Sequence, residues 1–301
     1  MINRTLWLHV GIPKTSTTAY QSWMRKNAGL LKTSGVVYPD RFGADNDKHN
    51  FLVRELRHSP NLEAFEQCLA DCHTPNMLLS DEGLTNHLDD FKDESLQRFR
   101  ELTKDWNVKI ILVTRNAASW TRSYHKQCVL NPHNGASPLW GTALTCEEIK
   151  DHPRIKRLVD HDGLARDLKI AFGAEFVYPF IYEDTSWFHA SLDIMRVNFD
   201  SSAKLPHSNQ SLPDWSIEFL RRVNSYTDLT EIRNQWKIAL QSYLGTNHTI
   251  LTNLTKGSQK FDRRTLEFIK SIQHEFLPAH SESVEEFLTY FFHTPSNIDR
   301  A

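Results

Sequence analysis

The sequence predicts an α/β fold: a three-layer sandwich in which a central parallel sheet of about five strands carries helices on both faces. Short apolar runs typical of buried strands alternate with helical patterns along the chain. The predicted strands lie at 6–10, 35–38, 76–80, 108–114 and 175–182. The clearest is 108–114, VKIILVT, whose unbroken apolar character is typical of a parallel strand covered on both faces.

Helical patterns fill the intervals between these strands. They lie at 19–31, 49–57, 61–72, 94–106, from 117 onward, 155–172 and 187–197. Further patterns at 216–225, 229–244, 263–276 and 283–291 predict C-terminal packing helices. The sequence shows no internal repeat and no convincing domain boundary. We therefore expect a single domain over 1–301, with a ligand-binding core of about 1–215 and C-terminal helices at about 216–301.

Composition is ordinary for a soluble globular protein, with 40% hydrophobic and 24% charged residues in a chain of 301. No apolar run approaches the roughly 18 residues that a membrane span needs, and the N-terminal residues lack the pattern of a signal peptide. We expect a cytoplasmic protein without a membrane span. The four cysteines lack the paired spacing of a zinc site, so we expect free thiols and no metal centre.

Charge is balanced overall but unevenly distributed. The net charge of −2 argues against a broad basic surface for nucleic acid. No acidic residue occurs before Asp40, and a second acid-free segment runs from Trp106 to Cys146. Both segments carry lysines and arginines. If they meet in space, they form a local anion site.

Residues 5–20, TLWLHVGIPKTSTTAY, predict a strand, a tight loop at Gly11 and Pro13, and a helix from about Thr17. Such a loop directs backbone N–H groups and the positive end of the helix dipole at one spot, where a phosphate binds. Lys14 adds a cation, and hydroxyl donors follow at Thr15, Ser16, Thr17 and Thr18. The alternative is an ordinary strand-to-helix turn capped by a threonine.

The spacing does not fit the nucleotide-binding loop GxxxxGK[ST], because Gly11 lies only three residues before Lys14. The pattern instead resembles the 5′-phosphosulfate loop hxGxPKTGTT of sulfotransferases that use 3′-phosphoadenosine 5′-phosphosulfate (PAPS). Ser16 replaces the usual glycine of that loop. The resemblance implies that the cofactor-binding residues are Gly11, Pro13, Lys14, Thr15, Ser16, Thr17 and Thr18, with Lys14 also catalytic.

A second motif follows the strand at 108–114. Arg115 and Ser123 are eight residues apart and resemble the family motif RxPxxxxxS, in which arginine and serine bind the 3′-phosphate of the cofactor. Ala117 stands where the family has proline, which only preorganises the first helical turn. A guanidinium suits phosphate because its planar donors are permanently charged. The alternative is a surface arginine and an ordinary helical serine.

Two residues compete for the role of general base. His49 follows the second predicted strand, and a histidine near its ordinary pKa can accept a proton at neutral pH. Glu82 follows the third strand in LLSDEGL, which resembles the LISSE segment of bacterial sulfotransferases. Ser80 in the same segment is a candidate contact for cofactor or acceptor. The alternatives are a helix-terminal histidine and a serine that caps the next turn.

The resemblance implies a P-loop NTPase-like sulfotransferase fold of bacterial type and transfer of a sulfuryl group from PAPS to a hydroxyl or amine. A carbohydrate and a hydrophobic alcohol stay equally open as acceptors. Residues 131–145 are expected beside the acceptor, and weaker resemblances occur at 207–212 and 255–257. Two alternatives are a nucleotide kinase with a degenerate loop, in which Asp81 would hold magnesium, and a non-catalytic protein that binds PAPS or the bisphosphate.

Overall fold

The computed structural model describes residues 4–40, 47–131, 133, 137–206 and 214–226. The chain divides into two compact units, of which the first comprises Met1–Arg122 and Lys150–Asn209. The second comprises Ser123–Ile149 and Gln210–Ala301. The predicted C-terminal helices at 229–244, 263–276 and 283–291 lie outside the described residues, as do the segments 207–212 and 255–257.

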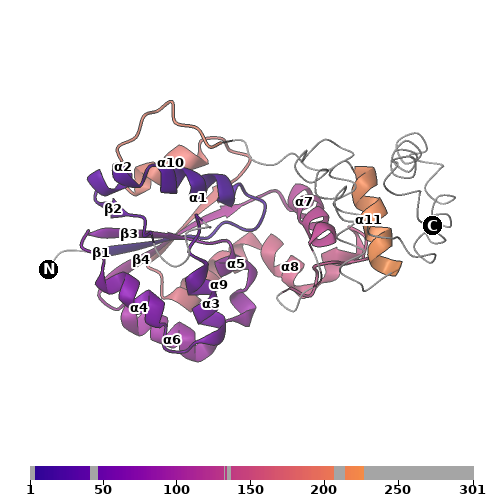
Figure 1. Cartoon of the computed structure of the whole chain (residues 1–301), viewed down its shortest axis with the longest axis horizontal. Helices are drawn as coiled ribbons and strands as arrows, with labels where there is room; N and C mark the ends of the chain where they lie inside the picture. The colour runs from indigo at the N-terminus through magenta and orange to yellow at the C-terminus, as the bar shows by residue number, and fades with distance from the viewer. Residues whose placement is uncertain (1–3, 41–46, 132, 134–136, 207–213, 227–301) are drawn as a thin grey trace, which may run out of the picture. The chain divides into compact units, whose positions relative to one another are not determined.

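A five-stranded parallel sheet forms the centre of the first unit (Figure 1). The strand order is β2-β3-β1-β4-β5, and every pair of neighbours is parallel. The strands are β1 (Arg4–His9), β2 (Val36–Val37), β3 (Asn76–Ser80), β4 (Trp106–Thr114) and β5 (Phe176–Ile181). The predicted α/β class and the parallel sheet of about five strands are confirmed.

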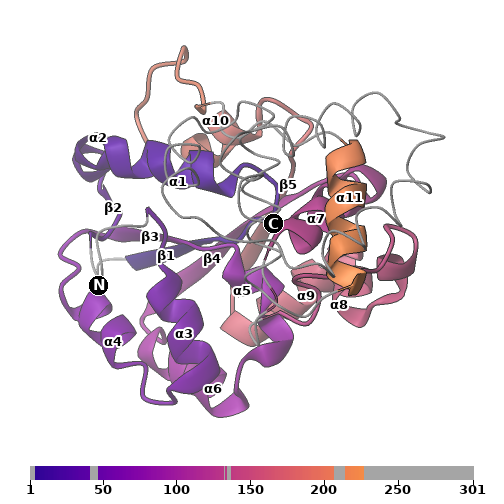
Figure 2. The same cartoon turned by 45° about the vertical axis from the view of Figure 1, so that its right-hand side comes forward.

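Helices cover both faces of this sheet, as Figure 2 shows from a second direction. One layer contains α1 (Thr17–Lys26), α2 (Ala28–Thr33) and α10 (Trp187–Ile194), and the other contains α3 (Asn50–His58), α4 (Glu63–Ala70), α6 (Asp93–Leu102) and α9 (His161–Phe172). Trp7, Tyr20 and Trp187 are buried in the cluster under the first layer. Phe99 packs against Phe65 and Phe172 under the second. The two cores fix the sheet between the layers.

Six further elements complete the described chain. They are α5 (Gly83–Asn86), η1 (Leu88–Asp90), α7 (Ala117–Leu130), η2 (Glu148–Asp151), α8 (Pro153–Val159) and α11 (Asp214–Tyr226). The boundary between the two units falls inside α7. No helix in the described part of the chain is both long and apolar enough to cross a membrane.

Two predicted helices are each divided in the structure. The helix predicted at 19–31 breaks at Asn27, whose side-chain amide donates to the Trp23 carbonyl at 2.8 Å and ends α1. The helix predicted at 155–172 breaks at Asp160, whose carboxylate accepts from the Gly163 N–H at 3.0 Å and begins α9. Asn and Asp side chains compete in this way for backbone groups, so a continuous apolar pattern does not guarantee a continuous helix.

The predicted strand at 35–38 is also shorter than expected, because only Val36–Val37 pairs with β3. Beyond Val37, His49 forms the hydrogen bonds to the end of β3, at Ser80. Its N–H donates to the Ser80 carbonyl at 2.9 Å, and its Nδ1 accepts from the Ser80 N–H at 3.0 Å. A side chain thus satisfies a backbone donor that a longer β2 would have paired.

In the second unit, α11 is joined to the segment around residues 140–145. The Asn224 amide donates to the carbonyls of Val129 and Thr142, both at 3.0 Å. Arg221 donates to the Ala143 carbonyl at 2.6 Å. These contacts hold the described part of the segment 131–145 within the second unit, and its expected place beside the acceptor stays a prediction.

Two buried histidines make the first unit sensitive to acid. Burial lowers the pKa of His9 to about 3 and that of His49 to about 4. In the unfolded chain both titrate near the ordinary value of about 6.5. The stability they contribute is therefore complete above pH 6.5 and is lost as the pH falls toward the folded-state values. At pH 5 we expect a loss of about 2 kcal/mol per histidine.

The variant His9→Phe tests this expectation, since it keeps a ring against Tyr20 and removes the titrating group. Between pH 6.5 and 5 the mean slope of the unfolding free energy against pH should fall by about 1.1 kcal/mol per pH unit relative to wild type. Urea denaturation at several pH values measures both slopes. Equal slopes in the two proteins would contradict the assignment.

Candidate functional site

The loop between β1 and α1 presents a row of unpaired backbone donors. The N–H groups of Val10 and Ile12 still donate to β4, to Ile111 and Val113, both at 2.9 Å. From Lys14 to Ala19 the backbone N–H groups have no acceptor among the described residues. They lie at the carboxyl end of the sheet and at the positive end of the α1 dipole, which is where anions bind.

The loop reaches this arrangement through two left-handed residues that are not glycine. Lys14 has φ 69° and Ser16 has φ 58°. Alternation of left-handed and other residues turns successive N–H groups toward a common point and forms an anion-binding concavity. The position at which Ser16 replaces the family's glycine therefore does have a positive φ. Serine adopts it at a cost of roughly 1–2 kcal/mol.

Packing around Gly11 holds the loop in place. A Cβ atom at this residue would lie 2.6 Å from Thr15 Oγ1 and 2.7 Å from Thr17 Cγ2. The Thr15 hydroxyl donates to the Ile12 carbonyl at 2.7 Å, and the Thr85 hydroxyl donates to the Gly11 carbonyl at 3.1 Å. Thr15 and Thr17 are buried, whereas Thr18 is exposed and Ser16 is half-buried. Thr15 thus stabilises the loop through the hydrogen bond that its buried hydroxyl donates to Ile12.

The structure brings the two acid-free segments together at this loop. Arg115 follows β4 and donates from Nη1 to the Lys14 carbonyl at 3.2 Å. Trp120 in α7 donates from its buried Nε1 to the Pro13 carbonyl at 2.7 Å. Burial, followed by the Arg115 charge, lowers the pKa of Lys14. Among the described residues Lys14 has no carboxylate partner, so its charge is available to an anion.

Arg115 itself has contacts on several sides. Its Nε donates to Ser119 Oγ at 3.1 Å, and its guanidinium carbon lies 5.0 Å from the centre of the Tyr182 ring. Glu183, two residues beyond β5, places Oε1 3.7 Å from Arg115 Nε. Ser119, Tyr182 and Glu183 were not among the residues predicted for the site. Their only sequence signal is position, since they follow the carboxyl ends of β4 and β5.

Two adjacent carboxyl groups follow β3 on the other side of the loop. Glu82 is partly exposed and accepts from Gln21 Nε2 at 3.2 Å and from Lys48 Nζ at 3.1 Å. Burial alone would raise the pKa of Glu82, but Lys48 and Gln21 lower it below its ordinary value. Burial alone would lower the pKa of Lys48, but the charges of Asp81 and Glu82 raise it.

Asp81 behaves in the opposite way. It is buried, its Oδ1 accepts from the Gly83 N–H at 2.7 Å, and its Oδ2 has no partner in the described chain. Burial and then the neighbouring Glu82 raise the pKa of Asp81 well above its ordinary value. The environment thus shifts the pKa values of the two carboxyl groups in opposite directions. Glu82 is therefore the ionised carboxylate near the loop.

His49 lies near this site but is enclosed. Its Nδ1 accepts from the Ser80 N–H and its Nε2 lies 3.1 Å from the Pro39 carbonyl, so both ring nitrogens are occupied. Ser80 is also buried, with Oγ 2.7 Å from His9 Nδ1. In this arrangement the His49 and Ser80 side chains hold neighbouring segments of the chain together. Glu82 is partly exposed, so it is the more accessible of the two candidate bases.

Ser123, the partner predicted for Arg115, is the first residue of the second unit. It lies in α7 and is half-buried. Its role in binding a 3′-phosphate stays a prediction from the eight-residue spacing.

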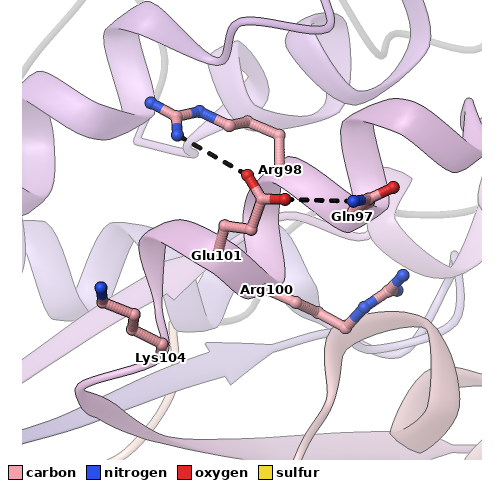
Figure 3. Close-up of a pocket in the computed structure, with 5 residues that line it drawn as sticks. All are labelled: Gln97, Arg98, Arg100, Glu101 and Lys104. Atoms are coloured by element: carbon pink, nitrogen blue, oxygen red, sulfur yellow. Dashed lines mark hydrogen bonds and ion pairs between the residues drawn. The ribbon is translucent and has the colours of Figure 1, made fainter.

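A shallow depression elsewhere on the first unit does not resemble a catalytic site. It lies on α6 and is lined by Gln97, Arg98, Arg100, Glu101 and Lys104 (Figure 3). Gln97 and Arg98 contact Glu101, whereas Arg100 and Lys104 point away from it. Arg100 donates instead to the Ala171 carbonyl at 2.8 Å. These contacts lie within α6 and between α6 and α9.

Comparisons with known proteins give no relative: no family model, curated protein or solved structure matches the chain. Within the described residues there is also no group of three or more His, Cys, Asp or Glu side chains that could hold a metal ion. The interpretation of the site therefore depends on its own geometry.

The close approach at Gly11 gives a direct test of the loop. Gly11→Ala should destabilise the protein by about 1–3 kcal/mol, because the added methyl group has no space between Thr15 and Thr17. Gly29→Ala is the matched control, since nothing lies within 4 Å of a Cβ atom there. In α2 it should stabilise the protein by up to about 1 kcal/mol. Urea denaturation measures the free energy of unfolding of both variants. Equal values for the two would contradict the close packing of Thr15 and Thr17 around Gly11.

Proposed function

We propose that this protein is a PAPS-dependent sulfotransferase with a P-loop NTPase-like fold. The observation that carries the proposal is the row of unpaired N–H groups from Lys14 to Ala19 beside the charges of Lys14 and Arg115. A 5′-phosphosulfate offers several anionic oxygens to this row. The arrangement agrees with the resemblance of the loop and of Arg115 to the family's two phosphate motifs.

In the proposed reaction the acceptor oxygen or nitrogen attacks sulfur. The bond between sulfur and the 5′-phosphate oxygen breaks, and adenosine 3′,5′-bisphosphate leaves. Lys14 and the loop N–H groups stabilise the negative charge that develops on the leaving oxygen. Glu82 accepts the proton from the acceptor, because it is partly exposed and ionised, whereas both nitrogens of His49 are occupied.

A second candidate is a nucleotide kinase. One observation favours it, namely that Asp81 at the end of β3 has a carboxylate oxygen without a partner in the described chain. A kinase needs such an oxygen for magnesium. Against it stands the loop, which lacks the second glycine of the nucleotide-binding pattern. A third candidate binds the bisphosphate without catalysis.

A thermal-shift titration separates these candidates. Adenosine 3′,5′-bisphosphate alone should raise the melting temperature, while ATP with magnesium should not. A ligand at a hundredfold excess over its Kd stabilises the folded state by about 2.7 kcal/mol. A shift with ATP and magnesium alone would favour the kinase. A shift with the bisphosphate but no sulfuryl transfer to any acceptor in a panel of alcohols, amines and carbohydrates would favour the binding protein.

Substitutions in the site separate catalysis from binding. Lys14→Ala should lower kcat by about 10²- to 10³-fold, since it removes a charge that acts on the leaving oxygen. Arg115→Ala should mainly weaken bisphosphate binding, by roughly tenfold or more. Lys26→Ala, an exposed residue at the end of α1, is the control and should change neither quantity. Wild-type transfer by Lys14→Ala would refute its catalytic role.

A further inference from the structure

The Glu183 carboxylate accepts hydrogen bonds from the donors next to Arg115. Its two oxygens lie 3.2 and 3.3 Å from the Asn116 nitrogen and accept from that N–H. Oε1 also accepts from Ser119 Oγ at 3.1 Å and lies 3.7 Å from Arg115 Nε. A backbone N–H at the start of α7, a hydroxyl and a guanidinium are the donors that a phosphate group would use. An internal anion already occupies them.

The contacts of Glu183 are loose for a carboxylate. Charge-assisted hydrogen bonds are about 2.7–2.9 Å long, whereas every contact of Glu183 with these donors is 3.1 Å or longer. The side chain is 43% exposed, so it can turn into solvent without opening the core. Arg115 is held independently by the Lys14 carbonyl and by Ser119. The guanidinium therefore keeps its place when the carboxylate leaves.

We infer that Glu183 is an internal competitor for the 3′-phosphate of the cofactor, an inference that rests on the proposed function. In the free protein its carboxylate neutralises Arg115 and occupies the donors of Asn116 and Ser119. The 3′-phosphate displaces it on binding. The apparent affinity is then reduced by the fraction of molecules in which the donors are free. After transfer, return of the carboxylate promotes release of the bisphosphate.

A carboxylate beside an arginine can also have the opposite role, in which it positions the guanidinium for the phosphate. The two roles predict opposite signs. Removing the charge of a competitor strengthens binding of the 3′-phosphate, while removing a positioning group weakens it. Glu183→Gln keeps the shape of the side chain and removes the charge, so it decides between them.

Isothermal titration calorimetry with adenosine 3′,5′-bisphosphate should give a Kd about tenfold lower for Glu183→Gln than for wild type. Adenosine 5′-monophosphate, which lacks the 3′-phosphate, should bind both proteins equally. Asp184→Asn is the matched control, since it removes a negative charge from the next residue, whose carboxylate contacts Ser186. It should leave both affinities unchanged.

The outcomes are distinct. Tighter bisphosphate binding by Glu183→Gln alone supports the competitor. Equal or weaker binding by Glu183→Gln overturns it, while bisphosphate binding by the wild type leaves the proposed cofactor site uncontradicted. Equal tightening by Asp184→Asn overturns it too, since a general charge effect then suffices. If neither wild type nor Glu183→Gln binds the bisphosphate, the proposed function fails and this inference fails with it.

Discussion

The parallel pairing of β1 with β3 on one side and β4 on the other determines where Lys14, Glu82 and Arg115 lie. Carboxyl ends of neighbouring parallel strands meet at one edge of a sheet, and the loops that follow them become neighbours there. The loop after β1 supplies the N–H groups, the turn after β4 supplies Arg115, and the end of β3 supplies Glu82. Residues from three distant parts of the sequence converge because backbone hydrogen bonds fix the order of the strands.

Much of this arrangement could be predicted from local sequence patterns. The apolar runs located the strands, and Gly11 with Pro13 located the loop, because turn residues interrupt strands for local steric reasons. The meeting of Lys14 and Arg115 could be expected from two acid-free segments that each contain a strand and the turn after it. What local patterns could not supply is the environment of a side chain. His49 looks like an exposed helix-terminal residue in the sequence, yet it is buried because β2 is too short to cover the edge of β3.

The same reason explains why other residues around Glu82 were not predicted. Gln21 and Lys48 matter because they contact Glu82, and a contact between α1, the segment before α3 and the end of β3 requires the three-dimensional fold. Asn27 and Asp160 divided two predicted helices because their side chains bond to backbone groups, which hydrophobic periodicity does not register. Fold class follows from patterns that recur along the chain, whereas a site depends on single contacts.

Charge is distributed across the loop in a way that suits group transfer. On the β4 side Arg115 approaches the Lys14 carbonyl and has Glu183 as its acidic neighbour, and on the β3 side Asp81 and Glu82 have Lys48 as their cationic neighbour. In the reaction we propose, Lys14 and Arg115 would stabilise the leaving group as it gains negative charge, and Glu82 would accept the proton released by the acceptor. The left-handed residues Lys14 and Ser16 add to this order, since their strained backbone directs the N–H groups before any ligand arrives. Thr15 and Thr17 pack closely around Gly11, so the fold itself holds the loop in the conformation that directs its N–H groups.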